Sequence, residues 1–256
     1  MYLRPAAAAF RVHLRNTLAR PLFQIMLFVQ PFTMVLLTHY VYGHAGSGAS
    51  FYVMFGSGMS GMWVATAFSS AGDLGRERGY GTIQPVLASG VPLWVVSAGR
   101  ACGALALSVV PVVTSTLASV FVFRTPVPDE LSVVGMLLGV AAFGIGCHSF
   151  GLVLGHLFLL SRRTVVLQNF LEWPLIIVSG VIVPLTALPT GVRWFSAVLP
   201  MRWGTEAAER SFSEGVIPWP LLGAAVGIAA IYFAAAVALS HAIERRVRTT
   251  AGLEVI

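Results

Sequence analysis

The sequence predicts an all-α integral membrane protein with six transmembrane helices, an N-terminal amphipathic interfacial helix, and short re-entrant outer helices before the last span. Composition is the first reason, because 57% of the residues are hydrophobic and only 10% are charged, whereas a soluble domain carries about 25% charged residues. The mean hydropathy is +0.82. Since no long polar stretch could fold separately, residues 1–256 are expected to form a single transmembrane domain.

The second reason is the recurrence of apolar runs of about 20 residues, the length that crosses roughly 30 Å of hydrocarbon. These runs begin after Pro21 and continue almost to the end of the chain. We place the six spans near residues 22–42, 51–71, 96–122, 133–160, 165–184 and 219–241.

The distribution of positive charge predicts the orientation. All 16 basic residues are arginine. If the N-terminus is cytoplasmic, the inner arginines are Arg4, Arg11, Arg15, Arg20, Arg76, Arg78, Arg100, Arg162, Arg163, Arg245, Arg246 and Arg248. The outer ones are then Arg124, Arg193, Arg202 and Arg210. This excess of inner arginine follows the positive-inside rule, so we predict a multi-pass protein of the cell membrane with cytoplasmic N- and C-termini.

Residues 3–20 are expected to form the interfacial helix. At 100° per residue, Arg11 and Arg15 would each project within about 20° of Arg4, giving one charged face. Pro5 near the start and Pro21 at the end bound this helix, which would lie along the inner leaflet. A secretory signal peptide is the alternative, but the following apolar run is longer than the usual signal core, which favours an uncleaved anchor.

The complete lack of lysine excludes two chemistries from this chain. A phosphate-binding Walker A loop and a Schiff-base enzyme each require a lysine amine. The arginines flank apolar runs, so anionic lipid headgroups are the expected partner and nucleic acid is not. Cys102 and Cys147 lie inside apolar runs and the histidines lack ligand spacing, so we predict no disulfide and no metal site.

The inner loop between the second and third spans combines charge with flexibility. Its charged residues Arg76, Glu77 and Arg78 precede Gly79 and Gly81, and a short apolar run then ends at Pro92. This pattern would suit a small helix that projects from the membrane toward a partner. An ordinary charged loop is the alternative.

The fifth predicted span contains a polar group in its interior. Gln168, Asn169 and Glu172 follow one another there, and Glu172 lies about 12 Å along the helix from Thr164. Ionisable side chains inside a membrane usually face protein or a cavity, so these residues are candidates for lining a substrate pathway. The alternative is that Glu172 pairs with Arg163 or Arg100 near the inner interface.

The outer stretch from Leu185 to Pro218 is the longest connection between predicted spans. After Pro200, Arg202, Glu206 and Arg210 recur at four-residue steps, which predicts ion pairs along a helix. Two short helices dipping into the outer leaflet would satisfy this pattern. A plain surface loop is the alternative.

The inner loop resembles the corresponding loop of the membrane subunits of ABC-2 type ABC exporters, a family of drug, lipid and polysaccharide permeases. The matching residues are Arg76, Glu77, Arg78, Gly81, Thr82, Leu87, Ala88, Ser89 and Pro92, while Gln84, Pro85 and Val86 depart from the family pattern. A second resemblance precedes the last span, at Pro184, Leu188, Pro189, Trp194, Pro200, Glu206 and Arg210.

The resemblance implies a permease subunit that is not an enzyme by itself. Two copies of a cytoplasmic ATP-binding cassette subunit would hold the ATP and magnesium, and this chain would bind no cofactor. They would dock at the coupling residues Arg76, Glu77, Arg78, Gly79, Gly81 and Thr82. A second permease subunit, identical or different, would complete the pathway. The outer gate would comprise Pro184, Leu188, Pro189, Trp194 and Pro200.

A bacterial exporter of a hydrophobic or amphipathic compound, as in drug or antibiotic efflux, is the main functional hypothesis. Export of lipid or polysaccharide by the same family is the nearest alternative. An ion-coupled secondary transporter would usually show paired broken helices in two related halves, which the sequence does not display. A membrane-embedded enzyme would require clustered acidic or histidine residues at one face, whereas the ten acidic residues are scattered.

Overall fold

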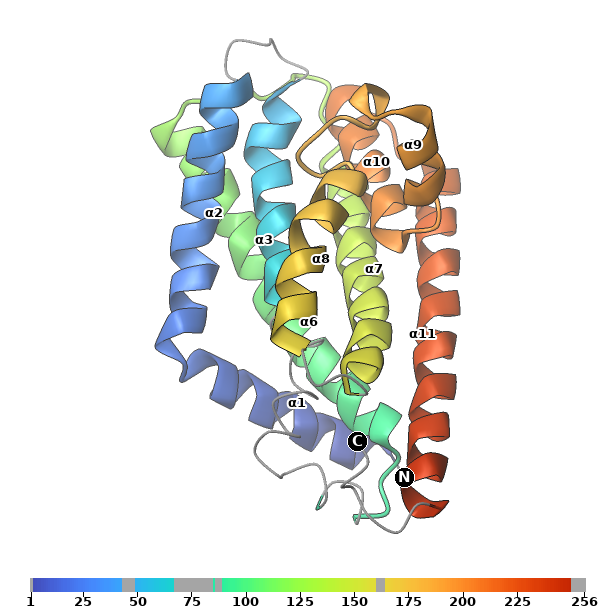
Figure 1. The fold of residues 1–256 in the computed structure, drawn as a ribbon. Helices are drawn as coiled ribbons and strands as arrows, with labels where there is room; N and C mark the ends of the chain where they lie inside the picture. The colour runs from blue at the N-terminus through green and yellow to red at the C-terminus, as the bar shows by residue number, and fades with distance from the viewer. Residues whose placement is uncertain (1, 43–48, 67–84, 86–88, 160–163, 250–256) are drawn as a thin grey trace.

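The computed structural model describes residues 2–42, 49–66, 85, 89–159 and 164–249, and within these ranges its elements are all helical (Figure 1). They are α1 (Leu3–Leu18), α2 (Pro21–Tyr42), η2 (Tyr52–Gly56), α3 (Ser57–Thr66), α6 (Leu93–Leu117), η4 (Ala118–Val122), α7 (Val133–Leu159), α8 (Thr164–Val178), η5 (Leu185–Ala187), α9 (Thr190–Ser196), α10 (Pro200–Ser213) and α11 (Trp219–Thr249). The segments η2 and η4 are π-helical, and η5 is a 3₁₀ turn.

Four helices in the described part of the chain are long and apolar enough to cross a membrane. They cover Phe23–Tyr42, Leu93–Val122, Val133–Leu159 and Trp219–Arg246. These helices match the first, third, fourth and sixth predicted spans, and the last one runs past the predicted end at residue 241. The second predicted span is helical from η2 through α3 to Thr66, and residues 67–71 lie outside the described ranges.

The predicted end of the fifth span at residue 184 is wrong. Helix α8 ends at Val178 and has 15 residues, fewer than the roughly 20 needed to cross the hydrocarbon in full. The cause is Gly180, whose φ of 79° lies in the left-handed region that terminates helices. Apolar composition continues after this glycine, so hydropathy alone did not locate the end of the helix.

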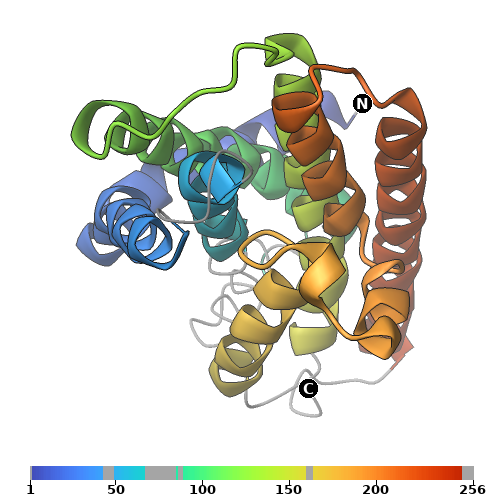
Figure 2. The ribbon, with the colours of Figure 1, turned by 90° about the horizontal axis from the view of Figure 1, so that it is seen from above.

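Helix α3 occupies the centre of the bundle. All of its described residues are buried, as expected for a helix that is apolar on every side. Gly58 and Gly61 let it approach α6 closely, because a Cβ atom at Gly61 would lie 2.7 Å from the Pro111 side chain. Seen from above, α2 and α11 stand on opposite sides of the bundle with α3, α6 and α7 between them (Figure 2).

The N-terminal segment forms the helix α1, which crosses the lower end of the bundle at a large angle to α2 (Figure 1). It packs on α6, where Gly103 leaves room for the His13 side chain. His13 and Thr17 are buried, while Arg4, Arg11 and Arg15 are exposed. The start of α6 and the end of α11 lie at this same end of the bundle.

Candidate functional site

Three regions of the molecule contain the predicted functional residues: the inner loop, the middle of α8 and the outer segment before α11. The coupling residues predicted in the inner loop lie outside the described residues; they are Arg76, Glu77, Arg78, Gly79, Gly81 and Thr82. The exit of that loop is described from Ser89 onward, and it leads into the first turn of α6.

The first turn of α6 is held by the last helix. The N–H of Leu93 donates a hydrogen bond to the Glu244 carboxylate on α11. His241, one turn earlier on α11, has its Nδ1 atom 3.8 Å from the same carboxylate. Helix N-termini leave backbone N–H groups unpaired, and a carboxylate satisfies them well. Sequence reasoning missed Glu244 because its partner lies about 150 residues away along the chain.

In the middle of α8 the three predicted pathway residues differ in their exposure. Gln168 is buried and its Nε2 atom has no hydrogen-bond partner in the structure. Glu172, one turn further along the same face, is half-buried, and no hydrogen bond or ion pair of the described residues involves it. Asn169 is exposed on a different side of the helix. The pathway hypothesis therefore concerns Gln168 and Glu172 more directly than Asn169.

In the outer segment, prolines set the boundaries of the short helices. Pro184 precedes η5, Pro189 precedes α9, and Pro200 is the first residue of α10. This placement suits proline, which lacks an N–H and has a φ angle already close to helical. The residues predicted as an outer gate differ in burial, since the Leu188 side chain is buried whereas the Trp194 side chain is 75% exposed. The structure therefore does not bring Trp194 against the buried gate residues.

Helix α10 lies antiparallel against the first half of α7, and glycines permit the close contact. A Cβ atom at Gly139 would lie 2.7 Å from the Ala208 Cα atom, and one at Gly204 would lie 2.6 Å from the Phe143 Cα atom. The start of α10 contacts Gly146, about 20 Å along α7 from its outer end at 1.5 Å per residue. The chain thus lies midway along α7 at the start of α10, and α10 leads it back to the end where α7 begins.

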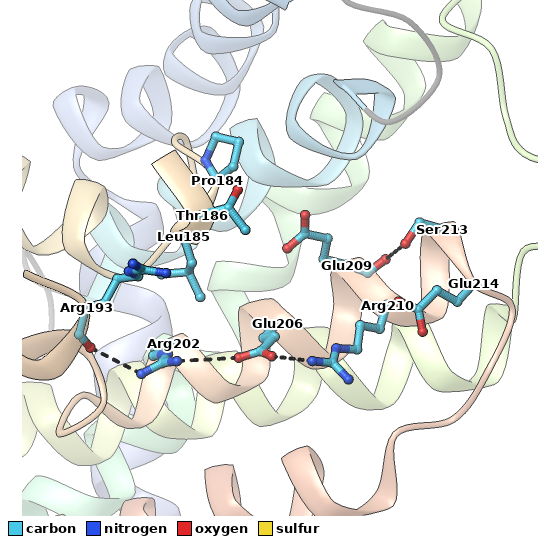
Figure 3. Close-up of a pocket in the computed structure, with 10 residues that line it drawn as sticks. All are labelled: Pro184, Leu185, Thr186, Arg193, Arg202, Glu206, Glu209, Arg210, Ser213 and Glu214. Carbon is cyan, nitrogen blue, oxygen red and sulfur yellow. Dashed lines mark hydrogen bonds and ion pairs between the residues drawn. The ribbon is translucent and has the colours of Figure 1, made fainter. Parts of the chain in front are cut away.

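A pocket of about 310 Å³ lies between α10, α9 and the segment that follows α8. Its lining residues are Pro184, Leu185, Thr186, Arg193, Arg202, Glu206, Glu209, Arg210, Ser213 and Glu214 (Figure 3). The predicted ion pairs along α10 are confirmed, with nitrogen-to-oxygen distances of 2.8 Å for Arg210 and Glu206 and 3.8 Å for Arg202 and Glu206.

One further pocket residue ties α10 to the second span. The Tyr52 hydroxyl of η2 donates a hydrogen bond of 2.6 Å to the Glu209 carboxylate. Burial raises the pKa of Glu209 above its ordinary value, and the hydrogen bond from Tyr52 opposes this shift by stabilising the charged form. Tyr42 at the end of α2 donates a bond of 2.9 Å to the Ile182 carbonyl in the adjoining segment. These contacts join three distant parts of the sequence at the outer end of the bundle.

Comparisons with known proteins agree with this architecture. Residues 7–212 match the family described as ABC-2 type transporter. The chain is 26% identical over 141 residues to ABC transporter G family member 20 of Dictyostelium discoideum, covering 55% of this chain and 19% of that protein. It is 22% identical over 169 residues to the probable multidrug ABC transporter permease YbhR of Escherichia coli K12, covering 63% of this chain and 44% of that protein.

The chain spans less than half the length of either of these relatives. The family match nevertheless covers most of the present sequence, from the middle of α1 to the end of α10. Four helices of membrane-spanning length are present in the described residues, as a membrane component requires. The chain is therefore a membrane-embedded protein that belongs to the ABC-2 type transporter family.

Proposed function

We propose that this chain is the membrane subunit of an ATP-driven exporter and forms the pathway for a hydrophobic or amphipathic compound, as in drug efflux. The observation that carries the proposal is the family match over residues 7–212. The printed name of the Escherichia coli relative, a probable multidrug permease, supports a drug-like substrate class. The lack of lysine supports a division of labour, because these residues cannot form a Walker A loop and ATP would be bound by an ATP-binding cassette outside them.

The proposed topology has six spans with both ends on the cytoplasmic side of a bacterial cell membrane. The supporting observation is that α2, α3, α6, α7, α8 and α11 all run along the long axis of the bundle (Figure 1). Helix α3 and helix α8 would supply the two crossings beyond the four long helices. Helix α1, with its exposed arginines, would lie on the inner leaflet.

Two ATP-binding subunits would dock beneath the inner loop of a dimer of permease chains, holding ATP and magnesium. Closure of these subunits would move the loop and, through the bond between Glu244 and Leu93, the inner end of α11. Helix α11 also packs against α10 at the outer end, where Leu222 and Ala225 meet Ala207. Movement at the inner end would then reach the re-entrant α9–α10 segment, the proposed outer gate. Such coupling requires different substrate affinities in the inward and outward states.

Co-purification tests the proposed class. When the tagged chain is purified in mild detergent from its native membrane, we expect a soluble subunit with a phosphate-binding loop to remain attached. Mass spectrometry of the purified complex would identify this subunit from its sequence. Repeated isolation of a transport-active chain without any ATP-binding partner would overturn the proposal.

Replacing Glu172 with glutamine should reduce export of a cationic amphipathic dye by about tenfold while ATP hydrolysis continues. The reason is that one charge-assisted contact to a bound cation contributes about 1.5–3 kcal/mol, and glutamine keeps the shape but loses the charge. Dye export from proteoliposomes is the measurement, with Glu130→Gln as the matched control, since Glu130 is exposed on the outer connection between η4 and α7. Equal export by the two variants would contradict a pathway role for Glu172.

A further inference from the structure

The outer pocket contains charges of both signs, and they are unevenly distributed along α10. Its cationic end comprises Arg193 of α9 and Arg202 of α10, which meet where the Arg202 guanidinium donates a hydrogen bond of 3.3 Å to the Arg193 carbonyl. The carboxylates of Glu209 and Glu214 lie further along α10 and just past its end. Figure 3 shows the Arg193 side chain and Glu209 reaching into the pocket from opposite ends.

At the cationic end, neither Arg193 nor Arg202 has an ion pair with a carboxylate of the described residues that it does not share. The hydrogen-bond partner of the Arg193 guanidinium in the structure is the neutral Thr190 hydroxyl, at 3.3 Å. Arg202 shares Glu206 with Arg210, and Arg210 is the closer of the two at 2.8 Å against 3.8 Å. The Nε atom of Arg202 is buried and has no hydrogen-bond partner. Two guanidinium groups with unused donors form a favourable site for a phosphate.

The anionic end has two carboxylates, and Arg210, the cation near Glu209, makes its ion pair with Glu206 instead. Glu209 accepts its bond from Tyr52, a neutral hydroxyl. Glu214 is exposed, and no hydrogen bond or ion pair of its side chain occurs within the described residues. Arg202 and Glu209 are separated by about 10 Å along the helix axis at 1.5 Å per residue. Hydrogen-bond contacts of about 3 Å at each end leave about 4 Å to span, which a phosphate and an ammonium of one small headgroup can do.

The surface beside the pocket is apolar. Helix α9 and the turn that follows it expose Trp194 by 75%, Phe195 by 59% and Val198 by 57%. Tryptophan and phenylalanine at such positions commonly mark the boundary between headgroups and hydrocarbon. A molecule with a charged head in the pocket could lay its apolar tail along this side of α9.

We propose that the outer pocket binds the zwitterionic phosphoethanolamine group of an amphiphile, with its phosphate on Arg193 and Arg202 and its ammonium on Glu209. The same chemistry occurs in an outer-leaflet phospholipid and in free phosphoethanolamine. The proposal does not depend on the exported compound or on the ATP-binding partner. It requires only that the pocket open to the lipid interface.

Lipid titration of the purified chain, followed by native mass spectrometry, tests this site. The probes are phosphatidylethanolamine, phosphatidylglycerol, which lacks the ammonium, and a long-chain alkylamine, which lacks the phosphate. We expect phosphatidylethanolamine to bind about tenfold more tightly than either of the others, since each lacks one charge-assisted contact. Equal affinity for the three probes would overturn the proposal.

Variants at the two ends of the pocket should have different effects. Arg193→Gln, at an exposed position that the fold tolerates, should weaken phosphatidylethanolamine and phosphatidylglycerol alike by about tenfold. Glu209→Gln, which keeps an acceptor for Tyr52, should weaken phosphatidylethanolamine alone and so abolish the preference over phosphatidylglycerol. Arg124→Gln, an exposed arginine outside the pocket, is the control for loss of positive charge. If both pocket variants bind like this control, the site assignment is wrong.

Free phosphoethanolamine distinguishes the two sources of the ligand. Tight binding of the free compound, equal to that of the lipid, would support the pocket and assign its ligand to the soluble form. A lipid affinity at least about tenfold higher would assign it to the membrane, because burial of the tails then adds free energy. These measurements need neither ATP nor the partner subunit, so failure here leaves the proposed transport function standing.

Discussion

Replacing Glu77 with glutamine should leave the chain inserted in the membrane and abolish substrate-stimulated ATP hydrolysis by the complex. Glu77 lies in the inner loop whose residues resemble the docking loop of ABC-2 exporters. Removing one member of a desolvated charged pair at an interface costs about 2–5 kcal/mol, so docking should weaken by a factor of about 30 or more. ATP turnover in proteoliposomes, measured with and without an amphipathic dye, is the experiment.

Asp129→Asn provides the matched control for Glu77. It also removes one carboxylate, but from an exposed position on the opposite side of the proposed membrane. Stimulation by the dye should survive in this control, and both variants should reach the membrane in equal amounts. If the Glu77→Gln complex retains normal stimulated turnover, Glu77 has no role in coupling.

Replacing Gly204 with valine should destabilise the outer half of the bundle. A Cβ atom at this position would lie 2.6 Å from the Phe143 Cα atom of α7, so backbone rather than a movable side chain opposes it. Overpacking of this kind typically lowers the free energy of unfolding by about 1–3 kcal/mol. We expect a lower thermal unfolding midpoint in detergent and a loss of export, since α10 can no longer sit against α7.

Gly227→Val is the matched control, because a Cβ atom at Gly227 of α11 would meet nothing within 4 Å. This variant should unfold at nearly the temperature of the original protein. A Gly204→Val variant as stable as the Gly227→Val control would show that α10 does not pack against α7 as the structure describes.

The four long spans were predictable because hydropathy and charge are local properties of the chain. The predicted ends of the first, third and fourth spans lie within three residues of the observed helix boundaries. The ion pairs of Glu206 were also predictable, since a four-residue spacing brings side chains together on any helix. The end of α8 was not predictable from hydropathy, because apolar residues continue beyond Gly180. The helix stops there through a change in backbone conformation.

Contacts between residues far apart in the sequence could not be predicted from it. Glu209 looked like an ordinary residue of the outer segment, and only the packing of α10 brings it to the Tyr52 hydroxyl. Glu244 likewise gained a role only when α11 was placed beside the start of α6. Conversely, the resemblance to ABC-2 exporters assigns Trp194 to the outer gate, yet its side chain is exposed.

Residue types and their spacing alone predict a helical membrane protein that resembles the ABC-2 exporters, and they show that it lacks lysine. These conclusions depend on residue types and their spacing, which exist before the chain folds. The packing of the helices sets how far α10 enters the bundle, which charges share the outer pocket, and which helix holds the start of α6. Such contacts depend on which helix faces meet. Glycines such as Gly139 and Gly204 allow two helices to pack closely, but the sequence around them does not show which helix they face.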